Sequence, residues 1–322
     1  ALILSLTIII LGIFSFFLGL SNTFLIALIF SGLFSVVISF YHPAAIASLS
    51  RNFSDRRGFA VALHGTGGSI GETTAPILVG AVLKFTPLIW SNIFQISILP
   101  ALIFGVFMFI MLKNIPQEKS VENLTFKKFV LGVEGLFKNK KLLIVLLIAA
   151  GFAGGQGTIL TFLPIYMDEN LGFSPFKYGI YITLANVGGI VSQPMMGYLS
   201  DKYNRKLILA PSLTILGITY ACLLSSNIIL FTIVIIIMGI FLFPMMAILV
   251  VSATDLVDTR IQGTTVALVF ASVTIFSSFI PSLAGMLADT DIRYAFMLAS
   301  GIGILAGILA FFGNWTVSES RN

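Results

Sequence analysis

Ten runs of predominantly apolar residues follow one another along the chain, and each is long enough to cross a lipid bilayer as a helix. A bilayer core about 30 Å thick requires roughly 20 such residues, because each residue advances an α-helix by about 1.5 Å. The runs are 1–20, 23–48, 58–83, 88–112, 142–167, 176–200, 207–224, 228–254, 262–288 and 293–313. The pattern predicts an all-α integral membrane protein with ten transmembrane helices.

The composition excludes most soluble alternatives. Of the 322 residues, 57% are apolar and 10% are charged, whereas about a quarter of the residues in soluble domains are charged. The 18 Lys and Arg residues exceed the 13 Asp and Glu residues, but they lie in short loops between apolar runs, so no nucleic-acid partner is predicted. The single cysteine, Cys222, lies within an apolar run, and the sequence predicts no disulfide, metal site or cofactor.

The positions of Lys and Arg predict the orientation, because these residues stay cytoplasmic when loops are short. Alternate connections and the tail carry 15 of the 18 basic residues, and only Lys84, Lys177 and Arg293 lie on the other side. Both chain ends are therefore predicted to be cytoplasmic, in a multi-pass protein of the plasma membrane. Within the long connection 113–141, Leu, Phe and Val alternate with lysines at helical spacing. This spacing predicts a helix on the anionic membrane face, and a solvated linker is the alternative.

An internal repeat relates the two parts of the chain. A shift of 205 residues places Gly12 on Gly217 and Asn22 on Asn227. The same shift places Pro76 on Pro281 and Gly80 on Gly285. Matches of Gly, Asn and Pro at one constant offset are unexpected by chance in an apolar chain, and related halves are common in transporters.

The second copy of the repeat is preceded by two further helices, in runs 142–167 and 176–200, that have no counterpart before the first copy. The expected organisation is a truncated first half at 1–112, equivalent to helices 3–6 of an inferred twelve, and a complete six-helix half at 142–313. The linker 113–141 is expected to join the two halves, and a cytoplasmic tail is expected at 314–322. A native ten-helix protein is the alternative.

A turn with a characteristic sequence follows the second helix of the second half. Residues 197–206 read Gly-Tyr-Leu-Ser-Asp-Lys-Tyr-Asn-Arg-Lys and resemble the signature loop of the major facilitator superfamily, G-x-L-x-D-x-x-G-R-K. Only the second glycine differs, and its replacement, Asn204, tolerates positive φ better than other residues. The resemblance implies a monomeric transporter in which this loop is a cytoplasmic latch between the halves. The residues that it assigns to the latch are Gly197, Asp201, Arg205, Lys206 and, on the facing helix, Arg57.

A second resemblance covers residues 41–80. Tyr-His-Pro at 41–43, Arg-Arg-Gly at 56–58 and the glycine-rich run 64–71 resemble the fosmidomycin-resistance-like, drug-exporting branch of the same superfamily. Gly71, Ala75, Pro76 and Gly80 partly match its antiporter motif, G-x-x-x-G-P-x-x-G-G, with Ala75 and Val79 in place of two glycines. The match implies export. A close-packing helix face is the alternative interpretation of the glycines.

Polar side chains inside the spans are the candidate coupling and substrate residues, because ionisable groups at mid-bilayer cost at least a few kcal/mol. Glu72 is near the middle of its run, where desolvation favours exchange of a proton. His64 and His42 lie closer to the cytoplasmic end and could relay protons. Gln156 and Asn186 lie near mid-depth in the second half, and the family resemblance favours Gln156 as a substrate contact. For Glu72, Gln156 and Asn186, structural bonding between helices is the alternative. For the two histidines, the alternative is hydrogen bonding to backbone groups freed by Pro and Gly.

The sequence therefore predicts a secondary transporter that moves a small organic solute by alternating access, most simply by proton-coupled export. Uptake of a sugar or organic anion, by symport or facilitated diffusion, is the alternative. A membrane receptor or scaffold would need a soluble domain or long outer loops, and the outer loops are short. An intramembrane enzyme would need clustered catalytic groups such as H-E-x-x-H, so no enzymatic activity is predicted.

Overall fold

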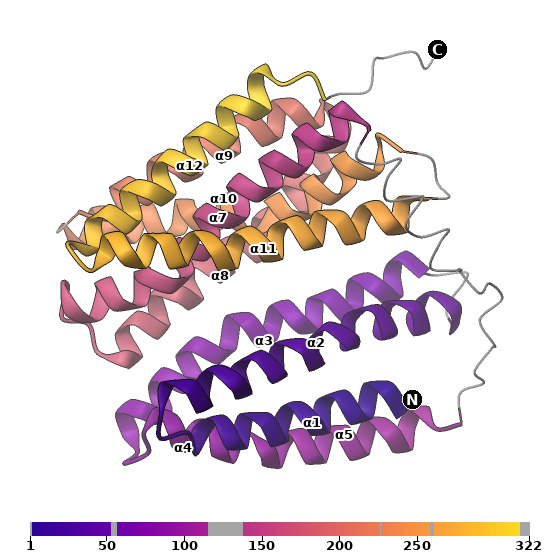
Figure 1. Ribbon diagram of the computed structural model, residues 1–322, viewed down its shortest axis with the longest axis vertical. Helices are drawn as coiled ribbons and strands as arrows, with labels where there is room; N and C mark the ends of the chain where they lie inside the picture. Colours follow the sequence, from indigo (N-terminus) through magenta and orange to yellow (C-terminus); the bar gives the residue numbers. More distant parts are fainter. Residues whose placement is uncertain (1, 53–56, 115–137, 226, 258–260, 316–322) are drawn as a thin grey trace. The chain divides into compact units, whose positions relative to one another are not determined.

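The structure, a computed structural model, describes residues 2–52, 57–114, 138–225, 227–257 and 261–315. Within these ranges every regular element is an α-helix (Figure 1). The side chains of a few helical residues, among them His42 and Arg57, are outside the description. So is most of the connection 113–141, where an interfacial helix was predicted. The chain divides into two compact units, unit 1 at residues 1–121 and unit 2 at residues 122–322.

Unit 1 contains five described helices. They are α1 (Leu2–Gly19), α2 (Phe24–Asn52), α3 (Arg57–Phe85), α4 (Trp90–Ile96) and α5 (Ile98–Leu112). The sequence predicts one helix over 88–112, but the structure divides it at Ser97. Pro100 has no amide hydrogen to donate to the carbonyl four residues before it, which weakens the helix at this point. At the break, the Ser97 hydroxyl donates to the Phe94 carbonyl of the preceding turn at 2.7 Å.

Unit 2 contains six described helices. They are α7 (Lys140–Glu169), α8 (Pro175–Lys202), α9 (Arg205–Cys222), α10 (Ile228–Thr254), α11 (Gln262–Ala288) and α12 (Ile292–Phe312). Five of them begin after a residue whose side chain accepts a hydrogen bond from a backbone amide of the first turn, a contact that stabilises a helix start by about 1 kcal/mol. These capping residues are Asn139, Ser174, Asn204, Asn227 and Asp291. The predicted starts are thus fixed by local sequence.

The cap of α12 is also charged. Asp291 accepts hydrogen bonds from the Arg293 side chain and backbone amide. These hydrogen bonds favour the carboxylate form and lower the pKa of Asp291 below its ordinary value. A carboxylate at a helix N-terminus is further favoured by the helix dipole.

The helices coincide with all ten predicted runs, and the all-α membrane fold is confirmed. Among the described residues, seven segments are long and apolar enough to cross a membrane by length and composition. They are Leu2–Gly19, Phe24–Tyr41, Trp90–Leu112, Lys140–Glu169, Ile228–Thr254, Thr264–Ala288 and Ile292–Phe312. The other three long helices, α3, α8 and α9, are the least apolar and carry the polar and glycine-rich residues of interest.

A close helix crossing recurs in both units at positions related by the repeat. In unit 1, α1 packs on α5 with Gly12 against Ile98 and Ala101. In unit 2, α9 packs on α12, and a Cβ atom added at Gly217 would lie 2.6 Å from the backbone nitrogen of Ile304. Glycine allows the backbones to approach at both crossings, as is common between membrane helices.

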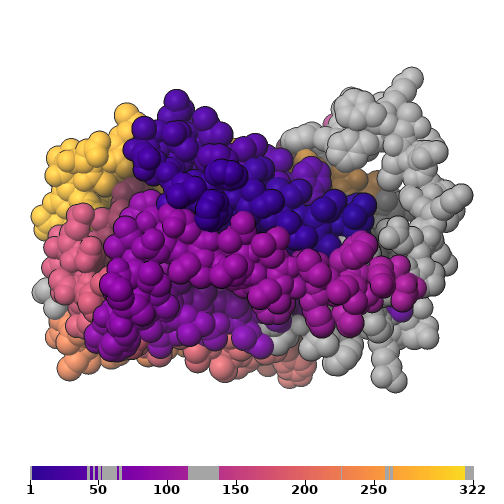
Figure 2. All heavy atoms as spheres, turned by 90° about the horizontal axis from the view of Figure 1, so that it is seen from below, coloured from indigo at the N-terminus to yellow at the C-terminus, as the bar shows by residue number. Residues whose placement is uncertain are grey.

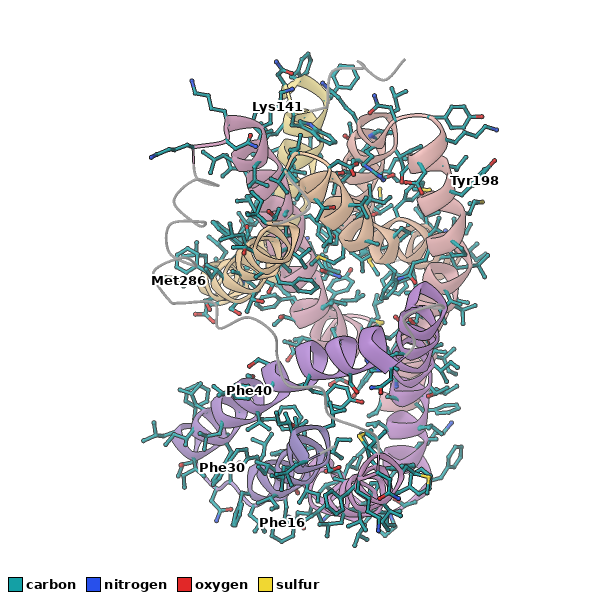
Figure 3. The ribbon with its side chains drawn as sticks, turned by 90° about the vertical axis from the view of Figure 1, so that its right-hand side faces the viewer. Phe16, Phe30, Phe40, Lys141, Tyr198 and Met286 are labelled. Atoms are coloured by element: carbon teal, nitrogen blue, oxygen red, sulfur yellow. The ribbon has the colours of Figure 1, made fainter. Side chains whose placement is uncertain are left out.

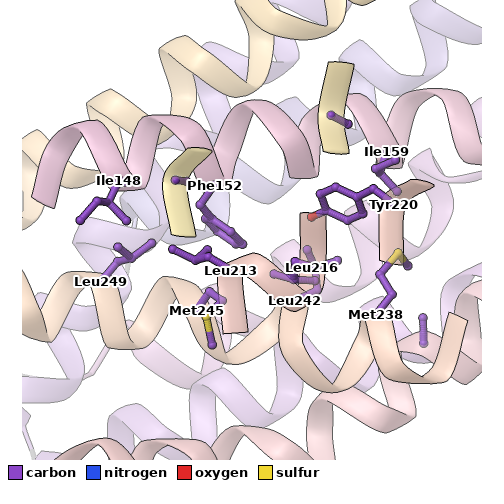
Figure 4. Packing of buried hydrophobic residues seen from close by; sticks show 14 of the residues in the cluster. Ile148, Phe152, Ile159, Leu213, Leu216, Tyr220, Met238, Leu242, Met245 and Leu249 are labelled. Carbon is purple, nitrogen blue, oxygen red and sulfur yellow. The ribbon is translucent and has the colours of Figure 1, made fainter. Parts of the chain in front are cut away.

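The interior of unit 2 is a continuous apolar core. Figure 4 shows part of it, where Ile148 and Phe152 of α7 lie beside Leu213 of α9 and Leu249 of α10. In unit 1, α1 packs against α2, α4 and α5, and Figure 2 shows their surfaces adjoining. The only described buried apolar side chains of this unit are nevertheless Leu4 and Ala45.

Large apolar side chains also point away from the helices of each unit. Figure 3 shows Phe40, Tyr198 and Met286 projecting outward, with exposed fractions of 59%, 63% and 72%. Such exposure would be costly in water, but lipid tails are as apolar as these side chains. The outward positions therefore suit a bilayer environment.

Candidate functional site

The signature loop joins α8 to α9 in a tight turn. Tyr203 ends α8, and the side chain of Asn204 caps α9 by accepting a hydrogen bond from the Lys206 amide at 2.9 Å. The tolerance of Asn for positive φ is not what this position uses. Its φ of 166° is extended backbone, and its polar side chain serves α9 as a helix cap, a role that Asn fills well.

Arg205 is the centre of the loop's charge network. Its guanidinium contacts the Asp201 carboxylate at 2.8 Å and, through Nε, the carboxylate of Asp255. Asp255 follows the last residue of α10. The Arg205 side chain is 21% exposed, while those of Asp201 and Asp255 are 68% and 43% exposed. The network holds the turn against the end of α10, because one guanidinium makes a single charge-assisted contact to each of two carboxylates from different elements.

On its other side, the loop contacts the end of α12 through Lys206. The Lys206 ammonium donates a hydrogen bond to the Gly313 carbonyl at 2.9 Å. A polar cavity of about 520 Å³ lies between these elements. Its lining includes residues 200–205 of the loop, Ser252, Asp255 and Leu256 at the end of α10, and Trp315.

Asp255 was not identified from the sequence. The available signal was an acidic residue directly after a long apolar run, on the side that carries most of the basic residues. Its partner, Arg205, is 50 positions away in the chain, so only the packing of α8 and α9 on α10 reveals the pair. Gly197, by contrast, has no described atom within 4 Å of the position of an added Cβ.

The structure places Glu72 at the middle of α3, where its side chain is exposed in the described chain. His64 lies on the same helix with its ring 5.9 Å from that of Tyr41 on α2. Eight residues along a helix separate Cα atoms by about 12 Å, too far for direct proton transfer between Glu72 and His64. The side chains of His42 and Arg57 lie outside the description, so their predicted roles stay predictions.

The antiporter-like motif forms one part of α3. Gly71 is exposed, with no described atom within 4 Å of an added Cβ. Ala75 is also exposed, Pro76 is inside the helix and Gly80 is buried. The glycine at position 71 is therefore not required by packing within unit 1.

The two amides of unit 2 differ in their surroundings. Gln156 is half-buried on α7, between Gly155, which packs against Tyr220, and Gly157, which packs against the Ser277 backbone. Asn186 is 8% exposed on α8, next to Ala185, whose backbone contacts Gly239 of α10. The structure thus places Gln156 nearer an open surface and Asn186 inside a helix interface.

The sequence profile of the Major Facilitator Superfamily matches residues 1–169 and 145–320. The chain belongs to this superfamily. A solved structure with a similar fold is a bacterial homologue of the human lysosomal transporter Spinster, in an inward-facing and unoccupied conformation. It superposes with a TM-score of 0.80 at 15% identity, over 96% of this chain and 81% of that chain. The predicted major facilitator fold and the expectation of a transporter family rather than an enzyme are confirmed.

Curated members of the superfamily match shorter segments. The proline/betaine transporter of Escherichia coli K12 is 25% identical over 174 residues, which is 51% of this chain and 33% of that protein. The bacillibactin exporter of Bacillus subtilis is 38% identical over 64 residues, 20% of this chain and 16% of that protein. The class H tetracycline resistance protein of Pasteurella multocida is 34% identical over 91 residues, 28% of this chain and 23% of that protein. The matched segments span a third or less of these relatives.

Proposed function

We propose that the protein is a secondary active transporter that moves a small organic solute across the membrane by alternating access. The observation that carries the proposal is the signature loop, in which Arg205 joins Asp201 to Asp255 at the end of α10. This network gives the loop a defined position from which Asp201 can engage the other half. We propose Arg57 as its partner there, so that the loop acts as a latch together with Gly197 and Lys206.

The direction we propose is export coupled to protons. A bacillibactin exporter and a tetracycline resistance protein are among the relatives, and α3 carries the antiporter-like residues Gly71, Pro76 and Gly80. A resemblance to the fosmidomycin-resistance-like branch supports the same direction. Glu72, at mid-helix, is the proposed proton-coupling group. Desolvation favours the neutral form of a carboxyl there, so it can take up a proton and release it as the cavity opens to each side. His64 and His42 are proposed relays.

Uptake is the second candidate function. A proline/betaine transporter is among the relatives, matched over 174 residues, and it favours a small zwitterionic solute. Uptake of a sugar or organic anion belongs to the same class. Gln156, as a half-buried amide on α7, is the proposed substrate contact in either direction. Asn186 is a proposed contact of lower priority because it lies within the α8–α10 interface. The protein is proposed to act as a monomer in a lipid bilayer.

The proposed location is the plasma membrane, with both chain ends cytoplasmic. Most basic residues lie in one set of loops, which favours this orientation. With Cys222 replaced by Ser, a cysteine introduced as Ser120→Cys should react with a membrane-impermeant thiol reagent only after the cells are permeabilised. Labelling of intact cells at this position would reverse the proposed orientation.

The transport experiment uses the intact protein in sealed vesicles with a panel of solutes, namely tetracycline, a catecholate siderophore, proline and glycine betaine. If Glu72 couples protons to solute, Glu72→Gln should lower gradient-driven transport about tenfold or more, since coupling free energies are commonly 1–3 kcal/mol. Solute exchange without a gradient should be retained, because Gln mimics the protonated carboxyl.

Two variants serve as comparisons. Glu169→Gln removes an exposed carboxyl at the end of α7 and should leave both activities unchanged. Asp201→Ala should slow both activities, because it weakens the latch rather than the coupling.

Loss of exchange in Glu72→Gln would assign Glu72 to substrate binding or structure, and retention of gradient-driven transport would exclude it from coupling. Accumulation of proline or betaine inside right-side-out vesicles would favour uptake over export.

A further inference from the structure

The chain does not run straight out of unit 2 after α12. Gly313 ends the helix in an extended conformation, and its amide donates to the Leu309 carbonyl at 2.8 Å. Two residues later, Trp315 turns back into the unit and is 2% exposed. Its indole Nε1 donates to the Ala310 carbonyl at 2.9 Å. A buried tryptophan removes about 150–250 Å² of surface, so this side chain is a substantial anchor.

The turn before Trp315 has no spare room. A Cβ atom added at Gly313 would lie 2.6 Å from the Leu309 carbonyl oxygen and 2.9 Å from the Ile144 side chain of α7. It would also lie 3.1 Å from the Trp315 ring. Any other residue at 313 must therefore displace the tryptophan, the start of α7 or the end of α12.

This segment is tied directly to the signature loop. The Gly313 carbonyl accepts the hydrogen bond from Lys206, at 2.9 Å, and cations are favoured at the C-terminal end of a helix. Trp315 lines the same cavity as Asp201, Arg205 and Asp255. The loop is thus held from two sides, by α10 through Arg205 and by the end of α12 through Lys206.

We propose that residues 313–315 form a C-terminal strap that positions the signature loop, with Trp315 and Lys206 as positioning residues for the cytoplasmic gate. The gating consequence rests on the proposed transport function, whereas the positioning itself does not. When the loop moves during gating, the strap must move with it or release Lys206. The strength of the strap therefore sets how readily the loop leaves the position described here.

The positioning can be measured by fluorescence, because the protein has two tryptophans. Trp90 is 53% exposed on α4 of unit 1, and the Trp90→Phe variant leaves Trp315 as the sole indole. Its emission should be blue-shifted and quenched weakly by acrylamide. Adding Lys206→Met should raise the quenching constant at least twofold. Lys202→Met is the matched control, because Lys202 belongs to the same loop but lies over the rings of Tyr198 and Tyr203, and it should leave quenching unchanged.

Movement of the loop can be measured through a thiol. In a Cys222→Ser background, Tyr203→Cys places a reporter at a residue that is 60% exposed in the loop. Trp315→Ala should change its alkylation rate by maleimide severalfold in inside-out vesicles, and Trp315→Phe should restore much of the original rate. If the Trp315→Ala protein is too unstable to purify, Lys206→Met in the same background carries the test.

Transport then connects the strap to the gate. Trp315→Ala and Lys206→Met should lower the maximal transport rate severalfold with little change in the solute concentration at half-maximal rate. Unchanged Trp315 quenching in Lys206→Met, together with unchanged alkylation in both variants, would overturn the proposal. A lower melting temperature alone would identify Trp315 as a structural anchor only. Altered alkylation in a protein that transports no tested solute would support positioning while contradicting the proposed function.

Discussion

The crossing of α1 and α5 in unit 1 corresponds, at a shift of 205 residues, to the crossing of α9 and α12 in unit 2. Gly12 and Gly217 lie at the two crossings, each against the last described helix of its unit. The surroundings of the crossings differ. In unit 2, the core includes Leu216, which is 1% exposed. The equivalent residue of unit 1, Leu11, is only partly buried and lines an apolar cavity of about 440 Å³.

The helix α7 accounts for much of this difference. Gly151 of α7 lies against Ala306, and Gly155 lies against Tyr220 and the Ala299 backbone. The residues of unit 1 at the equivalent positions are Ala101, Ser15 and Phe94, and all three line the apolar cavity. The face that α7 covers in unit 2 is therefore open among the described residues of unit 1.

The comparison separates two levels of structure. A crossing between two helices needs only small residues at the right spacing, and both units contain them. A buried core needs a further helix that covers the pair, and within the described chain only unit 2 supplies one, α7. Equivalent residues in the two units should therefore contribute differently to stability, which can be tested with matched pairs of variants.

The largest difference is expected for the leucines. Leu216→Ala removes a fully buried side chain and should cost about 2 kcal/mol or more, because the surrounding helices cannot fill the cavity that it leaves. Leu11→Ala should cost less than half as much, because Leu11 already borders a cavity. Thermal unfolding of both variants in the same detergent measures the difference. Equal losses of melting temperature would break the comparison by showing that Leu11 is packed as tightly as Leu216.

One turn further along the same helices, hydroxyl groups stand at equivalent positions in the two units. Removing them is expected to change stability less than the leucine substitutions do, and in opposite directions in the two units. The Ser15 hydroxyl lies 2.6 Å from the Ser97 hydroxyl and donates to the Phe94 carbonyl at 3.0 Å. At the equivalent position, the buried Tyr220 hydroxyl has no hydrogen-bond partner among the described residues. A hydrogen bond contributes about 1 kcal/mol and an unsatisfied buried hydroxyl costs about 1–3 kcal/mol. Ser15→Ala should therefore lower the melting temperature, and Tyr220→Phe should leave it unchanged or raise it.

The same unfolding assay checks both changes, and the ring of Tyr220 is kept in the Phe variant, so packing against Gly155 is preserved. Destabilisation by Tyr220→Phe would show that the hydroxyl has a partner, and the two equivalent positions would then be alike in this respect. A neutral Ser15→Ala would show that the two serine hydroxyls contribute little at the α4–α5 break.

The candidate site could be predicted only in part. The signature loop was recognisable because its residues are consecutive, and Asp201, Arg205 and Lys206 form contacts at the turn. Their partners Asp255 and Gly313 were not predicted, because they come from the ends of α10 and α12. The capping role of Asn204 was not predicted, since residue type alone cannot distinguish a left-handed residue from a helix cap. For Glu72, His64, His42, Gln156 and Asn186, the functional roles stay proposals.

The sequence by itself determined where the helices run. Apolar length set the spans, capping residues such as Asn139 and Asn227 set helix starts, and glycines at a constant offset set the repeated crossing. These features depend on neighbours within one or two helical turns. Only the tertiary structure decided which residues meet across helices, including the Arg205 network, the burial of Trp315 and the different environments of Leu11 and Leu216. The physical reason is that lipid tails are as apolar as the helices. Hydrophobicity therefore determines which segments enter the bilayer, whereas close packing determines which helices contact one another.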